Sequence, residues 1–111
     1  MERLEYYREC IQKLLMEYSQ GKTIDGEIDI EIIFDTQRDR YLLVNLGWNE
    51  HRRIYNCILH LEIKNGQIWI QRNQTDIKIA EKLVEMGIPK QDIILGLQPV
   101  YVREDTGFGV A

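Results

Sequence analysis

The stretch IYNCILHLEIKNGQIWIQR, residues 54–72, decides the fold. Asn65 and Gly66 stand between two runs in which apolar and polar residues alternate, which is the pattern of a β-hairpin closed by a two-residue turn. The turn fixes the register of the two strands. It sets apolar residues opposite each other in two cross-strand pairs: Ile63 with Ile68, and Leu61 with Ile70.

Alternation extends outward from this hairpin and predicts four antiparallel strands, at residues 27–35, 41–48, 54–64 and 67–72. One apolar set is assigned to the core face: Ile28, Ile30, Ile32, Phe34, Leu42, Val44, Leu46, Trp48, Tyr55, Cys57, Leu59, Leu61, Ile63, Ile68 and Ile70. The connecting loops are expected to set Phe34 opposite Leu42 and Leu46 opposite Cys57. The hairpins agree with one another, which favours a meander.

Two helices flank the predicted meander. The first spans about residues 2–20 and carries an apolar stripe of Leu4, Tyr7, Ile11, Leu14, Leu15 and Tyr18. The second is expected to begin near Thr75 as N-cap and to end at Met86-Gly87, with Gly87 closing it. The run Ile93–Leu95 is predicted as a short strand or an extended cover, and residues 98–111 as an irregular tail. The fold class is therefore α+β.

The second face of the sheet is unusually apolar for a solvated surface. It is expected to carry Ile33, Tyr41, Leu43, Asn45, Ile54, Asn56, Ile58, His60 and Trp69. Either the C-terminal tail or another chain is expected to cover it, because exposed apolar patches mark interaction sites. The candidate partner interface is Tyr41, Leu43, Ile58, His60 and Trp69, and a homodimer is one alternative.

Length and composition limit the functional classes. The chain has 111 residues with a net charge of −4, and 44% of the residues are hydrophobic, which fits one domain over residues 1–111. No apolar run is long enough to span a membrane, and the charged N-terminus has no secretory signal core. A cytoplasmic location is therefore expected. The net acidity disfavours independent nucleic-acid binding, leaving only weak or partner-dependent contact.

The residue pattern contains no known catalytic or cofactor motif. Cys10 and Cys57 lie in apolar patterns and are expected to be buried thiols, and the Cys and His spacing does not suit zinc. We expect no catalytic residue, no cofactor and no metal. Glu27, Asp29 and Glu31 share one strand face and leave a divalent-cation site open as a minor alternative to a solvated face.

Basic residues are expected to gather at both ends of the sheet, because successive hairpins turn at opposite ends. Arg38, Arg40 and Lys64 fall at one end, with His51, Arg52, Arg53 and Arg72 at the other. Arginine presents a planar fork that suits phosphate. Arg52, Arg53 and Arg72 are therefore the candidate anion or DNA contacts, against the alternative of loop solubility and ordinary ion pairs.

Several segments resemble the XisI family, the cyanobacterial fdxN-element excision controlling factors. They are YYRECIQKLLMEYSQ, FDTQRDRYLLVNLGW, RRIYNCILHLEIKNGQIWIQ, AEKLVEMGIPKQDIILGL and TGFGVA, and together they run from Tyr6 to Ala111. The resemblance implies a single XisI-like domain. It also implies an accessory role in DNA-element excision during heterocyst differentiation, together with an XisH-like protein and a recombinase. Arg52, Arg53, Trp69, Thr106, Gly107 and Phe108 are the motif positions of interest.

Three functions follow as hypotheses. The first is a non-enzymatic controlling factor that acts by protein–protein contact with an XisH-like partner. The second is a DNA-binding accessory factor using Arg52, Arg53 and Arg72. The third is a metal-dependent nuclease using Glu27, Asp29 and Glu31.

Overall fold

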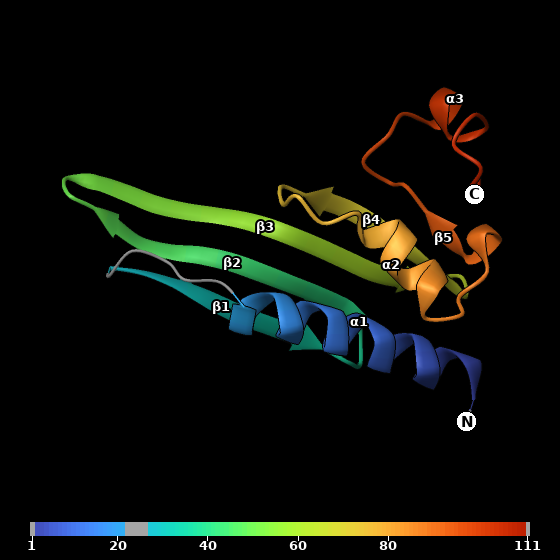
Figure 1. The fold of residues 1–111 in the computed structure, drawn as a ribbon, viewed down its shortest axis with the longest axis horizontal. Helices are drawn as coiled ribbons and strands as arrows, with labels where there is room; N and C mark the ends of the chain where they lie inside the picture. Colours follow the sequence, from blue (N-terminus) through green and yellow to red (C-terminus); the bar gives the residue numbers. More distant parts are fainter. Residues whose placement is uncertain (1, 22–26, 111) are drawn as a thin grey trace.

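The computed structural model describes residues 2–21 and 27–110. Its main elements, in chain order (Figure 1), are α1 (Arg3–Gly21), β1 (Ile28–Asp35), β2 (Arg40–Asn49), β3 (Arg52–Lys64), β4 (Gln67–Asn73), α2 (Ile79–Glu85), β5 (Ile93–Ile94) and α3 (Val100–Arg103). A 3-10 turn, Lys90–Asp92, precedes β5.

The strands form one sheet in the order β1-β2-β3-β4-β5. The first four make the expected antiparallel meander. The short fifth strand pairs with β4 in parallel, so Ile93–Ile94 belongs to the sheet and adds one strand to the predicted four. The α+β prediction is thus confirmed.

The central hairpin has the predicted register. Asn65 and Gly66 have φ angles of 55° and 77°, the left-handed pair that a tight two-residue turn requires. Ile63 lies opposite Ile68, and Leu61 lies opposite Ile70. The Asn-Gly signal therefore placed this part of the sheet correctly.

The predicted register of β1 on β2 is wrong by one residue. Phe34 lies opposite Tyr41 and not Leu42, because Arg40 is part of β2 and the loop is one residue shorter than expected. The Asp35 carboxylate accepts the backbone N–H groups of Gln37 and Arg38, both at 3.0 Å, and so tightens the turn. A one-residue slip exchanges the faces of β2. Its core side chains are Tyr41 and Leu43, in place of the expected Leu42, Leu46 and Trp48.

The predicted core face of β3 is correct only in its second half. A bulge opposite Leu43 and Val44 leaves Ile58 without a Cα partner, and Ile58 and Leu59 are both buried in the core. One inserted residue shifts the alternation to the other face. Tyr55 and Cys57 therefore leave the core face that Leu59 occupies. Leu46 lies opposite Tyr55, not Cys57.

The helices α1 and α2 cover the same face of the sheet. The apolar stripe of α1 and the α2 residues Ile79 and Leu83 join one cluster with the buried residues of β2, β3 and β4 (Figure 1). Cys10 lies inside this cluster and is a buried thiol, as predicted, whereas Cys57 is only half-buried. The opposite face carries neither α1 nor α2.

The second helix begins later than expected. The Thr75 hydroxyl accepts the backbone N–H of Ile77 at 3.1 Å and donates to Asn73, so Thr75 forms a turn of its own and does not cap the helix. The predicted end is correct. Gly87 has a φ of 96°, and the N–H groups of Gly87 and Ile88 bond to the carbonyls of Val84 and Leu83.

Charged and phenolic groups fasten α1 to the sheet. Arg8 donates two hydrogen bonds to the Asp39 carboxylate, at 2.8 and 3.2 Å, and the buried Tyr41 hydroxyl donates to the same carboxylate at 2.9 Å. Burial alone raises the pKa of Asp39, but the bonds from Arg8 and Tyr41 outweigh it and hold the pKa below its ordinary value. Near the start of α1, burial and a bond to Asp92 raise the pKa of Tyr7 to about 12.

Replacing Asp39 by Asn is expected to destabilise the fold by about 1–2 kcal/mol, since it weakens a half-buried charged network. Asn tolerates the left-handed backbone that Asp39 adopts, with φ of 55°. Urea denaturation measures the loss. The exposed Asp29→Asn on β1 is the matched control and should change stability by less than about 0.5 kcal/mol.

The same network predicts a pH dependence. The folded-state pKa of Asp39 lies below its ordinary 3.8, so its contribution is present above pH 3.8 and is lost as the pH falls through the folded-state value. Wild-type stability should fall over this range more steeply than that of Asp39→Asn. Parallel acid curves for the two proteins would contradict this role of Asp39.

Candidate protein-interaction surface

The sheet face opposite the helices carries an exposed apolar surface, which we call the open face: Ile33, Val44, Leu46, Trp48 and Tyr55. The Tyr55 side chain is 71% exposed, Ile33 49% and Trp48 48%, while Val44 is buried between them. The residues come from the three strands β1, β2 and β3. Side chains of this size left in water on adjacent strands are typical of a surface that meets a partner.

The open face is hollowed at its centre. A cavity of about 350 Å³ is lined by Glu31, Ile32, Ile33, Val44, Leu46 and Tyr55. The bulge in β3 creates this arrangement, because it turns Tyr55 out of the core and aligns it with Leu46. The hollow is large enough to receive apolar side chains from a second polypeptide.

Acidic side chains border the hollow along β1. Asp29 and Glu31 are exposed and alternate with Ile33 on the same face. Within residues 2–21 and 27–110, neither carboxylate has an ion-pair partner, whereas Asp35 pairs with Arg38 at 3.2 Å. The β1 side of the open face is therefore negatively charged.

The C-terminal tail covers the other end of this sheet face. Trp69 in β4 is only 9% exposed, and the Lys64 ammonium lies 4.1 Å and the Arg103 guanidinium 5.3 Å from its ring centre. Arg103 donates from Nε to the Gln98 carbonyl at 3.1 Å, which holds the tail turn in place. Cation–π contacts of this kind favour a closed tail. Trp69 is thus covered by its own chain.

The structure separates the five residues expected to form the partner interface. Tyr41 and Leu43 are fully buried beneath α1, and Ile58 is buried in the β3 bulge, so these three belong to the core. They were expected on the second face of the sheet, which was wrong. The register slip between β1 and β2 turns Tyr41 and Leu43 into the core, and the bulge in β3 does the same for Ile58. His60 and Trp69 do lie on the face away from the helices. There Glu62 joins them, accepting from His60 at 2.9 Å and pairing with Arg40 at 3.2 Å.

The three candidate anion-binding arginines do not form one cluster. Arg52 and Arg53 lie at the tip of the β2–β3 hairpin, which projects beyond β4 (Figure 1). Arg72 lies opposite His60, about 23 Å from Arg53 at roughly 3.3 Å per residue along β3, and donates to the Cys57 carbonyl at 2.6 Å. The prediction that Arg72 lies at the same end of the sheet as Arg52 and Arg53 was wrong. The strand β4, with 7 residues, is shorter than β3, with 13, so it ends before it reaches the β2–β3 hairpin tip.

Arg53 instead pairs with the exposed Trp48. Its guanidinium carbon lies 5.3 Å from the Trp48 ring centre. This contact connects the basic hairpin tip to one end of the open face.

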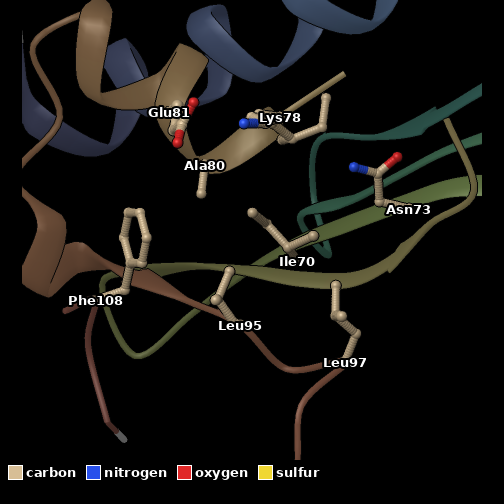
Figure 2. A pocket seen from close by; sticks show the side chains of 9 residues that line it. Ile70, Asn73, Lys78, Ala80, Glu81, Leu95, Leu97 and Phe108 are labelled. Atoms are coloured by element: carbon tan, nitrogen blue, oxygen red, sulfur yellow. The ribbon is translucent and has the colours of Figure 1, made fainter. Parts of the chain in front are cut away.

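A second cavity, of about 210 Å³, lies between β4, α2 and the tail. Figure 2 shows the apolar side chains of Ile70, Leu95 and Phe108 around it, with Lys78 and Glu81 on the α2 side. The Asn73 amide at its margin bonds internally to the Ile77 carbonyl at 2.8 Å and to Thr75. This cavity is therefore lined mainly by apolar side chains, with one basic and one acidic side chain on its α2 side.

Across the described parts of the chain, no group of three or more His, Cys, Asp or Glu side chains is arranged to hold a metal ion. Asp29 and Glu31 lie in β1 and Glu27 directly precedes it, and the three do not form such a site. None of the described helices has the length and apolar character needed to cross a membrane.

The sequence interpretation missed Leu46, Trp48 and Tyr55 as surface residues. A signal was present in β1, where Ile32 and Ile33 are adjacent and break the alternation, so one of them must leave the core. No comparable signal marks Tyr55, because its spacing from Leu59 fits an uninterrupted strand.

Comparison with known proteins adds the family context. The family model described as XisI protein matches residues 1–110. The crystal structure of a XisI-like protein from Anabaena variabilis ATCC 29413 is 44% identical, with a TM-score of 0.93, and the match covers 99% of this chain and 100% of that one. The fdxN element excision controlling factor XisI from the same strain is 35% identical, with a TM-score of 0.88 and the same coverage. No curated protein gives a significant match.

Replacing Arg103 by Ala is expected to loosen the tail over Trp69. In a Trp48→Phe background, Trp69 is the one tryptophan left, since the chain has two. Acrylamide quenching of its fluorescence should increase about twofold or more when the tail no longer shields the ring. Arg52→Ala in the same background removes an arginine elsewhere and should leave quenching unchanged. Equal quenching in both variants would show that Arg103 does not hold the tail.

Proposed function

The chain belongs to the XisI family, and on that premise we propose that it is a non-enzymatic accessory factor controlling the excision of a DNA element. It acts through contact with an XisH-like protein. The whole-length match to the excision controlling factor, at 35% identity, is the observation that carries the proposal. That relative is named as a controlling factor and not as an enzyme.

The open face is the contact surface in this proposal. Three large side chains are exposed on it, Ile33, Trp48 and Tyr55; Ile33 and Tyr55 line the hollow, and Asp29 and Glu31 give it a charged border. An apolar centre with a polar rim is the usual anatomy of a protein interface. The tail already covers Trp69, so the open face replaces the Trp69 region as the primary surface.

The change Tyr55→Glu is expected to weaken binding to an XisH-like protein at least tenfold, since it places a charge in the centre of the contact. Isothermal titration calorimetry with purified partners measures the change. Tyr101→Glu is the matched control, because Tyr101 is 80% exposed on α3 and lies outside the open face. Loss of binding with Tyr101→Glu alone would move the contact to the tail. Absence of binding between the wild-type proteins at about 10 µM would remove the XisH-like partner from the proposal.

Direct DNA contact is the second candidate, and the projecting hairpin tip favours it. His51, Arg52 and Arg53 are exposed there, and Arg53 lies against Trp48. Arginine and an aromatic ring together suit phosphate and base contact. The net charge of −4 opposes strong binding by the whole molecule.

This second candidate predicts DNA binding at about 50 mM salt that weakens steeply as salt rises. The double variant Arg52→Ala/Arg53→Ala should lower the salt slope by about two, one for each phosphate that an arginine no longer neutralises. The double variant Arg3→Ala/Arg38→Ala removes the same charge elsewhere and serves as control. Fluorescence anisotropy with labelled duplex DNA measures both. Undetectable binding at low salt would eliminate direct contact by this tip.

A further inference from the structure

The two edges of the sheet differ in how they are protected. At the β5 edge the tail returns, and Gly109 donates its N–H to the carbonyls of Ile93 at 2.9 Å and Lys90 at 3.0 Å, bridging β5 in parallel. At the β1 edge, no other described strand pairs with the outer side of β1. An eight-residue strand without proline or lysine is an unusually open edge.

The backbone groups that face this edge follow from the pairing of β1 with β2. The Trp48 N–H donates to the Glu27 carbonyl at 3.2 Å, so residue 27 belongs to the set that bonds to β2. Bonded and non-bonded residues alternate in antiparallel strands. Ile30, Ile32 and Phe34 therefore direct their N–H and C=O groups outward, away from β2.

The side chains beside this edge are partly apolar on both faces of the sheet. Ile32 is 41% exposed on the helix face, and Ile33 is 49% exposed next to the hollow of the open face. Asp29 and Glu31 lie beside Ile33 without ion-pair partners among the described residues. An added strand would thus meet apolar side chains on one face and a mixture of carboxylate and apolar side chains on the other.

The charges argue against a second copy of this chain as the occupant. Antiparallel pairing of two β1 strands with Ile32 opposite Ile32 sets Asp29 opposite Asp35, and Glu31 opposite Glu31 in the neighbouring register. Directly opposed like charges destabilise a strand pair. A strand with basic residues at the same positions meets the carboxylates favourably.

We propose that the outer edge of β1 binds an extended segment of a partner protein by strand addition, with basic side chains of that segment on the open face beside Asp29 and Glu31 and apolar side chains on the helix face beside Ile30 and Ile32. Main-chain hydrogen bonds to Ile30 and Ile32 supply the pairing, and the carboxylates select the partner's charge. The inference rests on the proposed function in that it specifies how the partner is held.

The probe for this edge is a blocked peptide of about eight residues in which Val alternates with Lys, matched in length to β1. Titrated into ¹⁵N-labelled protein, it should shift the amide resonances of β1 saturably at about 1 mM or below and slow the exchange of the Ile30 and Ile32 amides. The same peptide with Glu in place of Lys should bind about fivefold more weakly or worse. Shifts centred elsewhere, or none up to about 5 mM, would overturn the proposal.

Two pairs of variants separate backbone pairing from side-chain contact. Ile32→Pro removes an outward N–H and should abolish the β1 shifts, whereas Ile32→Ala keeps that N–H and should weaken binding only about threefold. Glu31→Lys leaves Asp29 as the one opposing carboxylate and should abolish the preference for the Lys peptide, whereas the exposed Glu17→Lys on α1 should leave it unchanged. Equal binding of the peptide by Ile32→Pro and Ile32→Ala would refute strand addition. If Ile32→Pro proves unstable, Glu31→Lys still tests the charge selection in a folded protein.

Failure of strand addition at β1 can be told apart from failure of the proposed XisH-like contact. If the XisH-like protein binds wild type and Ile32→Pro equally well, the accessory role stands and the β1 edge is not its contact. If the XisH-like protein binds neither, the peptide titration still decides whether the edge accepts a basic strand.

Discussion

Ile58 and Leu59 are consecutive in β3, yet both pack into the core beneath the helices. Two consecutive residues of a regular strand point to opposite faces, so the burial of both goes with the bulge opposite Leu43. The bulge in turn determines which side chains of β3 point to each face of the sheet. On one side of it, Leu59, Leu61 and Ile63 complete the core; on the other side, Tyr55 is turned outward to the open face. Without it, the long β2–β3 hairpin would present one continuous apolar stripe to α1.

The helices cover one face of the sheet, and the C-terminal tail covers part of the other face. The Arg8–Asp39–Tyr41 network fastens α1 over the β1–β2 turn, and the contact of Arg103 with Trp69 fastens the tail over the opposite face. Neither reaches the middle of the open face. The surplus of apolar residues in the composition therefore gathers at Ile33, Leu46, Trp48 and Tyr55, where it is available for contact.

The sequence was sufficient for the elements whose signals are local. Asn65-Gly66 determined the central register, and Gly87 marked the end of α2, because both positions require a left-handed backbone. The faces of β2 and β3 were not predictable in this way. Tyr55, Cys57, Leu59, Leu61 and Ile63 alternate without interruption, and only packing against α1 reveals that Ile58 is also buried. The register slip at the β1–β2 turn moved Tyr41 and Leu43 onto the expected interface, and the unrecognised bulge left Tyr55 out of it.

The bond from Gly109 to Ile93 and Lys90 has a consequence for stoichiometry. A sheet with two unprotected edges can accept an added strand on either side, which permits open-ended association. Here the tail blocks growth beyond β5, so extension of the sheet has a single direction. In the proposed complex a partner strand is therefore added at the β1 edge alone, and the tail closes the β5 edge against a further strand.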